Sequence, residues 1–264
     1  MKLQPRRRYL MMLLSVIGAS VGMSSGANAE DVLRVSVPHL PPYADIRPDN
    51  SAKGLLPDLF AAIAEKMGIK VTISVVPLPR VIYELQNSAS DAAILIQNAT
   101  MEEVAERVSE LPSRALQSII IAKAGLPLRS YHDLEGKMLG IPRSVTGDSA
   151  FMKNEQIKKY EFLTYKQGAK MLKSDRIDAI DGTYLALYAA LKAEGFTPAE
   201  LGEPLMIQGH PAFVYFSKKA GQPALFEALK AACAELIQDG TFARIEQRYW
   251  DCFIEQKNCE HLDD

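Results

Sequence analysis

Apolar positions between residues 31 and 98 switch between the two-residue period of a strand and the longer period of a helix. Residues 33–37 alternate apolar and polar side chains, which predicts a strand, and nearby prolines end it. Residues 55–68 carry apolar side chains at four-residue intervals and finish in glycine, as amphipathic helices do. Three more segments continue the alternation of strand and helix patterns: 69–77, 79–90 and 91–98. The order β-α-β-α-β favours parallel strands joined by right-handed crossovers.

A second set of strand and helix patterns repeats this order further along the chain. Strands are predicted at 118–125, 138–143, 160–165, 177–182 and 211–219. Helices are predicted to begin after residue 149 and to cover 167–176, 223–240 and 242–250. Two α/β lobes joined by paired extended segments explain this arrangement. We assign residues 30–121 and 213–264 to lobe 1, and residues 122–212 to lobe 2.

The first 29 residues have the three regions of a secretory signal peptide. Lys2 and three arginines precede an apolar segment, and a run of small residues ends at Ala29. Serine and glycine dilute the apolar segment, which is too short for the roughly 20 apolar residues of a membrane-spanning helix. We therefore expect cleavage after Ala29 and a periplasmic protein.

The charge left after this cleavage argues against a nucleic-acid partner. The signal segment contains four of the 30 Lys and Arg residues and no acid, so 26 basic residues remain against 32 acidic ones. A mildly acidic chain without a long Lys or Arg run lacks the positive surface that holds a phosphate backbone.

The three cysteines fall into two groups. Cys252 and Cys259 lie seven residues apart in a polar C-terminal segment, and we expect them to form a disulfide in an oxidising compartment. Cys233 lies in an apolar run and is expected to be a buried thiol. A metal site is the alternative, but neither the spacing nor a nearby pair of histidines supports it, and no cofactor is expected.

Four segments, at 54–94, 132–149, 171–180 and 223–250, follow one another in an order that resembles the family 3 (polar amino-acid type) extracellular solute-binding proteins of ABC transporters. The resemblance implies a type II periplasmic-binding-protein fold, with two α/β lobes joined by two hinge strands. It also implies a small polar ligand, an amino acid or a related carboxylate or amine, enclosed between the lobes. The implied partner is an inner-membrane ABC permease or a sensor, and the chain is expected to be a monomer.

The resemblance places the first half of the ligand site after two strands of lobe 1. Tyr43 follows a proline-rich loop, where related proteins often have an aromatic wall, although a surface tyrosine on a rigid loop is the alternative. Asn98 and Thr100 follow the strand at 91–98, where relatives have a Ser/Thr-rich turn. The position of the arginine that binds the ligand α-carboxylate in relatives reads Glu103 here. A carboxylate cannot pair with a carboxylate, so the sequence departs from the amino-acid pattern.

Another arginine could replace the missing one. Arg80 opens the helix after the strand at 69–77 and is the best substitute cation, with a surface salt bridge as the alternative. Arg107 is expected on a solvated helix face.

The second half of the site follows two strands of lobe 2. Arg143, Ser144 and Thr146 lie where a strand leads into a helix, and free N–H groups at a helix start bind anions. Relatives bind the acidic end of the ligand here, although helix capping by these hydroxyls or by Asp148 is the alternative. The ammonium-binding acid of relatives reads Thr183, and Asp181 lies two residues earlier on the same strand face.

An enzymatic function is the main competitor. The four histidines are dispersed, and no motif for a nucleophile, a metal or a phosphate loop is present. The same fold resembles that of cyclohexadienyl dehydratase, in which case Glu102 or Glu103 could act as a general acid. We therefore expect a receptor rather than an enzyme, and the sequence does not separate transport from sensing.

Overall fold

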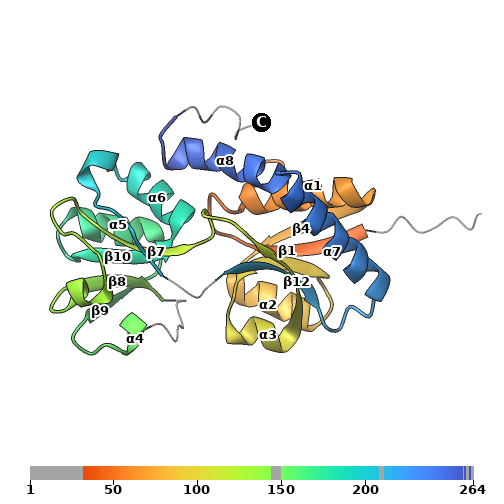
Figure 1. The fold of residues 1–264 in the computed structure, drawn as a ribbon, viewed down its shortest axis with the longest axis horizontal. Coiled ribbons are helices and arrows are strands. Elements are labelled where there is room, and N and C mark those ends of the chain that lie inside the picture. Colours follow the sequence, from red (N-terminus) through yellow and green to blue (C-terminus); the bar gives the residue numbers. More distant parts are fainter. Residues whose placement is uncertain (1–31, 144–149, 208–210, 258, 260–261, 263–264) are drawn as a thin grey trace, which may run out of the picture. The chain divides into compact units, whose positions relative to one another are not determined.

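The computed structural model describes residues 32–143, 150–207, 211–257, 259 and 262. These residues form two five-stranded sheets and a two-stranded hairpin, with helices on both faces of each large sheet (Figure 1). The strands are β1 (Val32–Pro38), β2 (Asp45–Ile46), β3 (Ala52–Lys53), β4 (Lys70–Val76), β5 (Ala92–Ile96), β6 (Ala105–Leu111), β7 (Ser118–Ala122), β8 (Met138–Pro142), β9 (Lys158–Phe162), β10 (Ala179–Thr183), β11 (Leu205–Met206) and β12 (Ala212–Ser217). The helices are α1 (Leu55–Met67), α2 (Leu78–Gln86), α3 (Ala99–Val104), α4 (Ala150–Lys153), α5 (Tyr165–Lys173), α6 (Tyr184–Ala193), α7 (Pro223–Gln238) and α8 (Thr241–Phe253), with short 3-10 helices η1 (Tyr131–Leu134) and η2 (Pro198–Glu200).

The first sheet has the strand order β4-β1-β5-β12-β6. β1 pairs in parallel with β4 and β5, as the β-α-β order of the sequence patterns predicts. β12 pairs antiparallel with β5 and β6. Successive residues of one strand point to opposite faces, so the sheet has two separate cores. Ala92 and Ile94 of β5 belong to the core under α1, α7 and α8, whereas Ala93 and Leu95 belong to the core under α2 and α3.

The second sheet has the strand order β11-β7-β10-β8-β9 and the same two-sided construction. β10 is parallel to β8 and antiparallel to β7. On β10, Ile180 packs with α5 and α6 on one face, and Ala179 packs with Phe151 and Leu134 on the other. The strand at 118–122, which the sequence analysis assigned mostly to lobe 1, pairs within this second sheet. The exact lobe boundaries stay a prediction.

Strand β6 contradicts the expectation that Arg107 lies on a helix. Its buried residues, Ala105, Val108 and Leu111, are three apart, which is closer to a helical period than to a strand period. The cause is a register shift opposite Val214 and Tyr215, where Val214 faces Ser109 and Tyr215 faces Arg107, so that one residue of β6 has no opposite partner. Such a β-bulge breaks the two-residue alternation that sequence analysis relies on.

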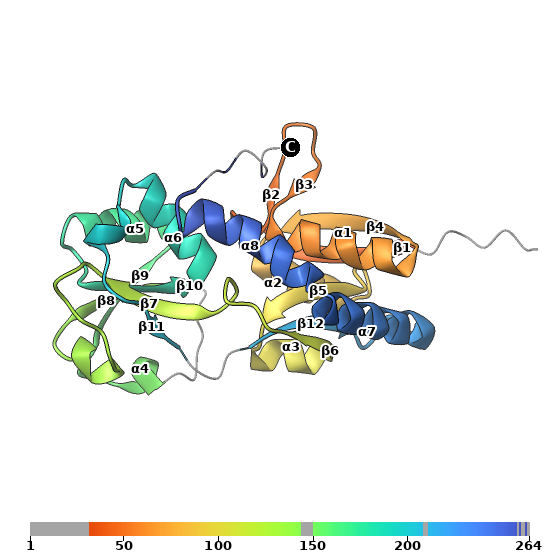
Figure 2. The same ribbon diagram turned by 45° about the horizontal axis from the view of Figure 1, so that its top comes forward.

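Helix α8 joins the two sheet layers. It contacts α1 beside the first sheet and α6 beside the second (Figure 2). Its Glu246 side chain accepts hydrogen bonds from the backbone N–H groups of Arg114 and Ala115, at 3.0 and 3.1 Å, in the segment that links β6 to β7. One crossing between the sheets is therefore tied to α8 by backbone hydrogen bonds.

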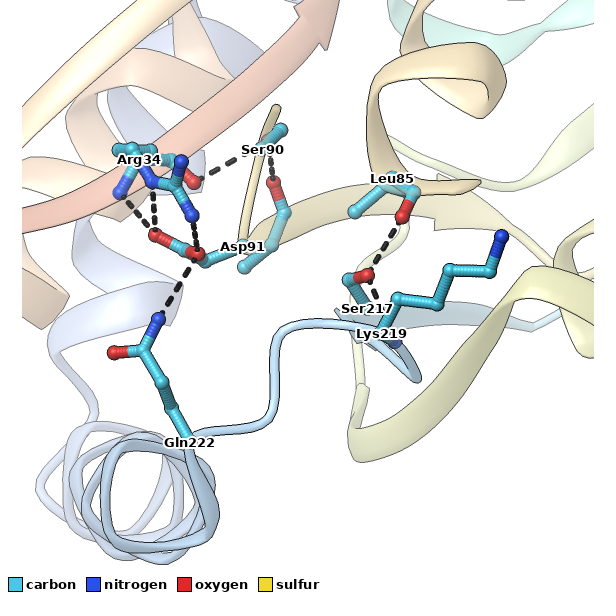
Figure 3. Close-up of polar contacts among 8 residues, drawn as sticks. Arg34, Leu85, Ser90, Asp91, Ser217, Lys219 and Gln222 are labelled. Carbon is cyan, nitrogen blue, oxygen red and sulfur yellow. Dashed lines mark hydrogen bonds and ion pairs between the residues drawn. The ribbon is translucent and has the colours of Figure 1, made fainter. Parts of the chain in front are cut away.

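A buried polar cluster fastens the N-terminal end of β5 to β1. Asp91 is fully buried and accepts hydrogen bonds from the backbone N–H and Nε of Arg34, at 2.9 and 3.0 Å. Figure 3 shows the Arg34 guanidinium facing this carboxylate, with Gln222 reaching it from the start of α7. A buried carboxylate is tolerated here because a cation, one backbone N–H and a side-chain amide replace the lost water.

The C-terminal segment carries a disulfide between Cys252 and Cys259, while Cys233 is a buried free thiol. Lys192 of α6 donates a hydrogen bond to the Cys252 carbonyl at 3.0 Å, so this end of α8 is attached to the second layer. Within the described ranges, none of the helices has both the length and the apolar character that crossing a bilayer demands. The predicted signal peptide, residues 1–29, lies outside the described residues.

Candidate ligand-binding site

Each sheet has one point where the chain leaves neighbouring parallel strands in opposite directions. In the first sheet this point lies between β1 and β5, because the chain runs from β1 out to β4 and returns to β5. In the second it lies between β8 and β10. In open α/β sheets a crevice forms at the carboxyl ends of such strands, which is where ligands bind. Most of the sequence-predicted residues lie near these two strand ends.

Asn98 and Thr100 follow β5 at the first of these points. Asn98 caps α3, because its side-chain oxygen accepts a hydrogen bond from the Met101 N–H at 3.0 Å. Thr100 is exposed in the first turn of α3. Glu103, at the position of the expected arginine, is exposed and lines a surface crevice of about 170 Å³ together with Lys218 and Lys219.

Arg80 is engaged by an acid on its own helix. Its Nε lies 2.8 Å from Glu84 Oε1, four residues on, and its guanidinium stacks over the Tyr83 ring at 4.8 Å. Glu84 is buried and also accepts a hydrogen bond from Ser36 of β1. The sequence analysis missed Glu84, although the four-residue spacing on a predicted helix was a readable signal.

Tyr43 is buried and joins the two layers. It is only 2% exposed, and its hydroxyl donates to the Ala115 carbonyl and accepts from the Leu185 N–H at 3.1 Å. Burial raises the pKa of this phenol, so it stays protonated. The ring that was expected to form an aromatic wall thus connects the loop after β1 to the start of α6.

Glu102, a candidate general acid in the enzymatic alternative, is held in its ionised form. Arg107 binds both of its oxygens, at 2.9 and 3.1 Å, and Tyr215 donates to it at 3.0 Å. The hydrogen bond from Arg107 is the main reason why the pKa of Glu102 lies below its usual value. A general acid at neutral pH needs a raised pKa, so this carboxyl is unsuited to the role.

At the second of these points, Arg143 follows β8 directly. Its side chain is 67% exposed and lies 3.7 Å from Glu161 of β9. Ser144 and Thr146, the hydroxyls predicted to bind an anion, lie outside the described residues.

Asp181 lies on β10 at the same point. The pairing of β10 with β8 ends at Ile180, so Asp181 is the first residue of β10 beyond it. It is 2% exposed, and burial raises the pKa of its carboxyl to about 7, against the opposing effect of the Gly182 N–H. The pKa of Tyr131 is raised by burial and by the Asp181 charge, which places the phenol within electrostatic reach. The sequence analysis did not anticipate Tyr131, because it comes 50 residues earlier in the chain.

Thr183 is the last residue of β10 and the N-cap residue of α6. Its N–H donates to the Tyr165 hydroxyl at 3.1 Å, and its own buried hydroxyl has no hydrogen-bond partner among the described residues. A side chain at Gly182 would overlap the Tyr165 ring, so glycine is required for this close approach. Burial raises the pKa of Tyr165 to about 12.

The described residues contain no group of three or more His, Cys, Asp or Glu side chains arranged to hold a metal ion. Residues 33–251 match the profile of the bacterial extracellular solute-binding proteins, family 3. The chain belongs to this family. The solute-binding protein has the type II periplasmic-binding-protein fold that the sequence resemblance implied, and its family is extracellular, in the periplasm or outside the cell.

Solved structures similar to the solute-binding protein share its fold at low sequence identity. An ancestral arginine-binding protein bound to arginine is 24% identical, with a TM-score of 0.63 over 83% of this chain and 98% of that chain. AbpA of Streptococcus pneumoniae, an amino-acid ABC transporter substrate-binding protein bound to L-arginine, is 17% identical, with a TM-score of 0.66 over 84% and 96%. A histidine kinase sensor domain is 15% identical, with a TM-score of 0.63 over 83% and 96%. No curated protein sequence matches the solute-binding protein.

Proposed function

We propose that this protein is a periplasmic receptor, exported with cleavage after Ala29, that encloses a small polar ligand between two lobes and delivers it to an ABC permease. The observation that carries the proposal is the family match over residues 33–251, together with polar residues near the strand ends of both sheets. A ligand that touches both halves stabilises the closed arrangement by its differential affinity.

The proposed contacts come from both sheets. Arg80, Asn98 and Thr100 are the candidates after strands of the first sheet, and Arg143, Ser144, Thr146, Asp181 and Thr183 are the candidates of the second. We propose that Tyr43 supports the site instead of lining it, because its hydroxyl is already bonded on both sides. The ligand class is an amino acid or a related small amine or carboxylate. The arginine bound by two of the similar structures makes L-arginine the first compound to test.

We also propose that the protein is not an enzyme. Glu102 is ionised, which supports this part of the proposal. Glu103, the other candidate general acid, is exposed to solvent. Incubation of the purified protein with prephenate and arogenate should give no product above the buffer rate. Turnover of either compound would overturn this part of the proposal.

The experiment that tests the receptor is binding combined with a measurement of closure. Residues 30–264 are purified, and binding of amino acids, amines, carboxylates and sugars is screened by thermal shift. Each compound that raises the melting temperature is then examined by small-angle X-ray scattering, where lobe closure should reduce the radius of gyration. If compounds bind with no change in scattering, the trap mechanism is wrong. If nothing in the panel binds, the proposed ligand class is wrong.

A further inference from the structure

Asp181 differs from the other buried acids of the described chain. Glu84 is paired with Arg80, and Asp91 is paired with Arg34. Asp181 is equally buried, but among the described residues it has no cation and no side-chain hydrogen-bond partner, only the N–H of Gly182. A buried carboxylate without a counter-charge is costly, so its missing partner has to come from elsewhere.

The position of Asp181 makes the ligand the natural partner. It lies at the carboxyl end of β10, where the chain diverges from β8 and α/β sheets bind their ligands. It shares a sheet face with Ala179, and Tyr131 packs against the core on that face. Within the described ranges, the titratable groups coupled to Asp181 are Tyr131 on η1 and Tyr165 on α5, and neither carries a positive charge. An aromatic ring beside a carboxylate suits an organic cation.

The three arginines considered for binding a ligand carboxylate also point to a positively charged ligand. Arg80 is paired with Glu84 at 2.8 Å and Arg107 with Glu102 at 2.8 Å. Arg143 is largely exposed and lies 3.7 Å from Glu161. Each of these three arginines therefore lies beside an acid of this chain, whereas Asp181 has no cation beside it among the described residues.

We propose, on the basis of the receptor function above, that Asp181 and Tyr131 bind the positively charged group of the ligand. The receptor then takes an organic cation, an amine or a guanidinium compound, and does not require a carboxylate on it. Deprotonated Asp181 is the form that binds. With a pKa of about 7, ionised Asp181 falls from about nine-tenths at pH 8 to about one-tenth at pH 6, so affinity should drop roughly tenfold.

The test uses calorimetric titration with four probes that separate charge from the amino-acid scaffold: L-arginine, agmatine, L-glutamate and succinate. Agmatine keeps the guanidinium and lacks the carboxylate. The proposal expects agmatine to bind about as well as L-arginine, and both to bind roughly tenfold more weakly at pH 6 than at pH 8. Binding at pH 7 should release about half a proton, which is measured by repeating the titration in buffers of different ionisation enthalpy.

Variants assign the effect to residues. Asp181→Asn keeps the shape of the side chain, should weaken binding roughly 100-fold, and should abolish the proton release. Asp175→Asn is the matched control, because this aspartate of the second layer is 82% exposed. Tyr131→Leu should weaken binding roughly fivefold, whereas Tyr160→Leu, at a 46% exposed tyrosine, should leave it unchanged.

The outcomes separate this inference from the receptor function. Tight binding of L-glutamate or succinate, unaffected by Asp181→Asn, overturns the cation site and leaves the receptor intact. Binding of L-arginine with no loss in Asp181→Asn and no proton release also overturns it. No binding of any probe, and none in the wider panel above, overturns the ligand class of the proposed function and the cation site with it.

Discussion

Replacing Asp181 by asparagine should stabilise the unliganded protein at alkaline pH and have much less effect at acidic pH. The carboxyl is buried with no cation beside it in the part of the chain that the structure describes, and its pKa is raised from 3.8 to about 7. A raised pKa means that the folded protein holds this proton where the unfolded chain has released it. The stability that protonated Asp181 provides is complete below pH 4 and is lost as pH rises toward 7.

The magnitude follows from the size of the pKa change. The difference between about 7 and 3.8 corresponds to about 4 kcal/mol over the full pH range, at about 1.4 kcal/mol for each pH unit. Stability is practical to measure between pH 5 and pH 8. Over this interval the free energy of unfolding of the wild-type protein should fall by about 3 kcal/mol through this one group. Asparagine does not titrate, so the variant should lose none of it.

The assay is urea unfolding of wild type, Asp181→Asn and the exposed control Asp175→Asn, each without ligand at pH 5 and pH 8. The stability of Asp181→Asn relative to wild type should rise by about 3 kcal/mol from pH 5 to pH 8, while that of Asp175→Asn stays constant. Groups common to both proteins cancel in this comparison. If the stability difference between Asp181→Asn and wild type is the same at both pH values, the buried, unpaired carboxylate does not exist as described.

Three further substitutions test contacts that hold the site in place, each by urea unfolding. Tyr43→Phe should cost about 1–3 kcal/mol, because it leaves a buried N–H and a buried carbonyl without the phenol between the layers; an unchanged midpoint would remove Tyr43 from its bridging role. Replacing Cys252 and Cys259 together by serine should lower the free energy of unfolding by roughly 2 kcal/mol, and the variant should be as stable as the wild type measured in reducing agent. Sensitivity of the double variant to reductant would refute the assignment. Gly182→Ala should cost about 1–3 kcal/mol because its methyl group meets a tyrosine ring, whereas Gly202→Ala has ordinary clearance and should cost clearly less; equal losses would contradict the packing at β10.

Much of the fold could be predicted from the sequence, because most elements keep a regular period. The alternating residues of β1 and the four-residue spacing of α1 appear in the structure as predicted, and the family and fold expected from the resemblance are confirmed. Strand β6 was missed because its bulge replaces alternation by a three-residue spacing. Helix α6 was missed because its sequence is apolar on nearly every side and shows no amphipathic pattern.

The candidate site was less accessible from the sequence, and its residue roles stay predictions. Asp181 could be selected because it lies near the end of a recognisable strand. Tyr131 could not, because only the tertiary fold brings the 3-10 helix near the end of β10. The pairing of Arg80 with Glu84 was visible as a four-residue helical spacing. The burial of Glu84 and its hydrogen bond from Ser36 of β1 were not, because the two residues are far apart in the sequence.

The cost of Asp181 is itself an argument about function. An asparagine at this position would fill nearly the same volume without a buried charge, and stabilising replacements of this kind are common in proteins. A group that lowers the stability of the empty protein at neutral pH is useful when a ligand supplies the missing charge, because the ligand then removes the penalty as it binds. That gain is available only to a cation, since an anion at the same place would add to the repulsion. The altered amino-acid positions, Glu103 and Thr183, and the lack of a cation beside Asp181 among the described residues favour one interpretation. The protein is a receptor that gains binding energy when the ligand neutralises this buried acid.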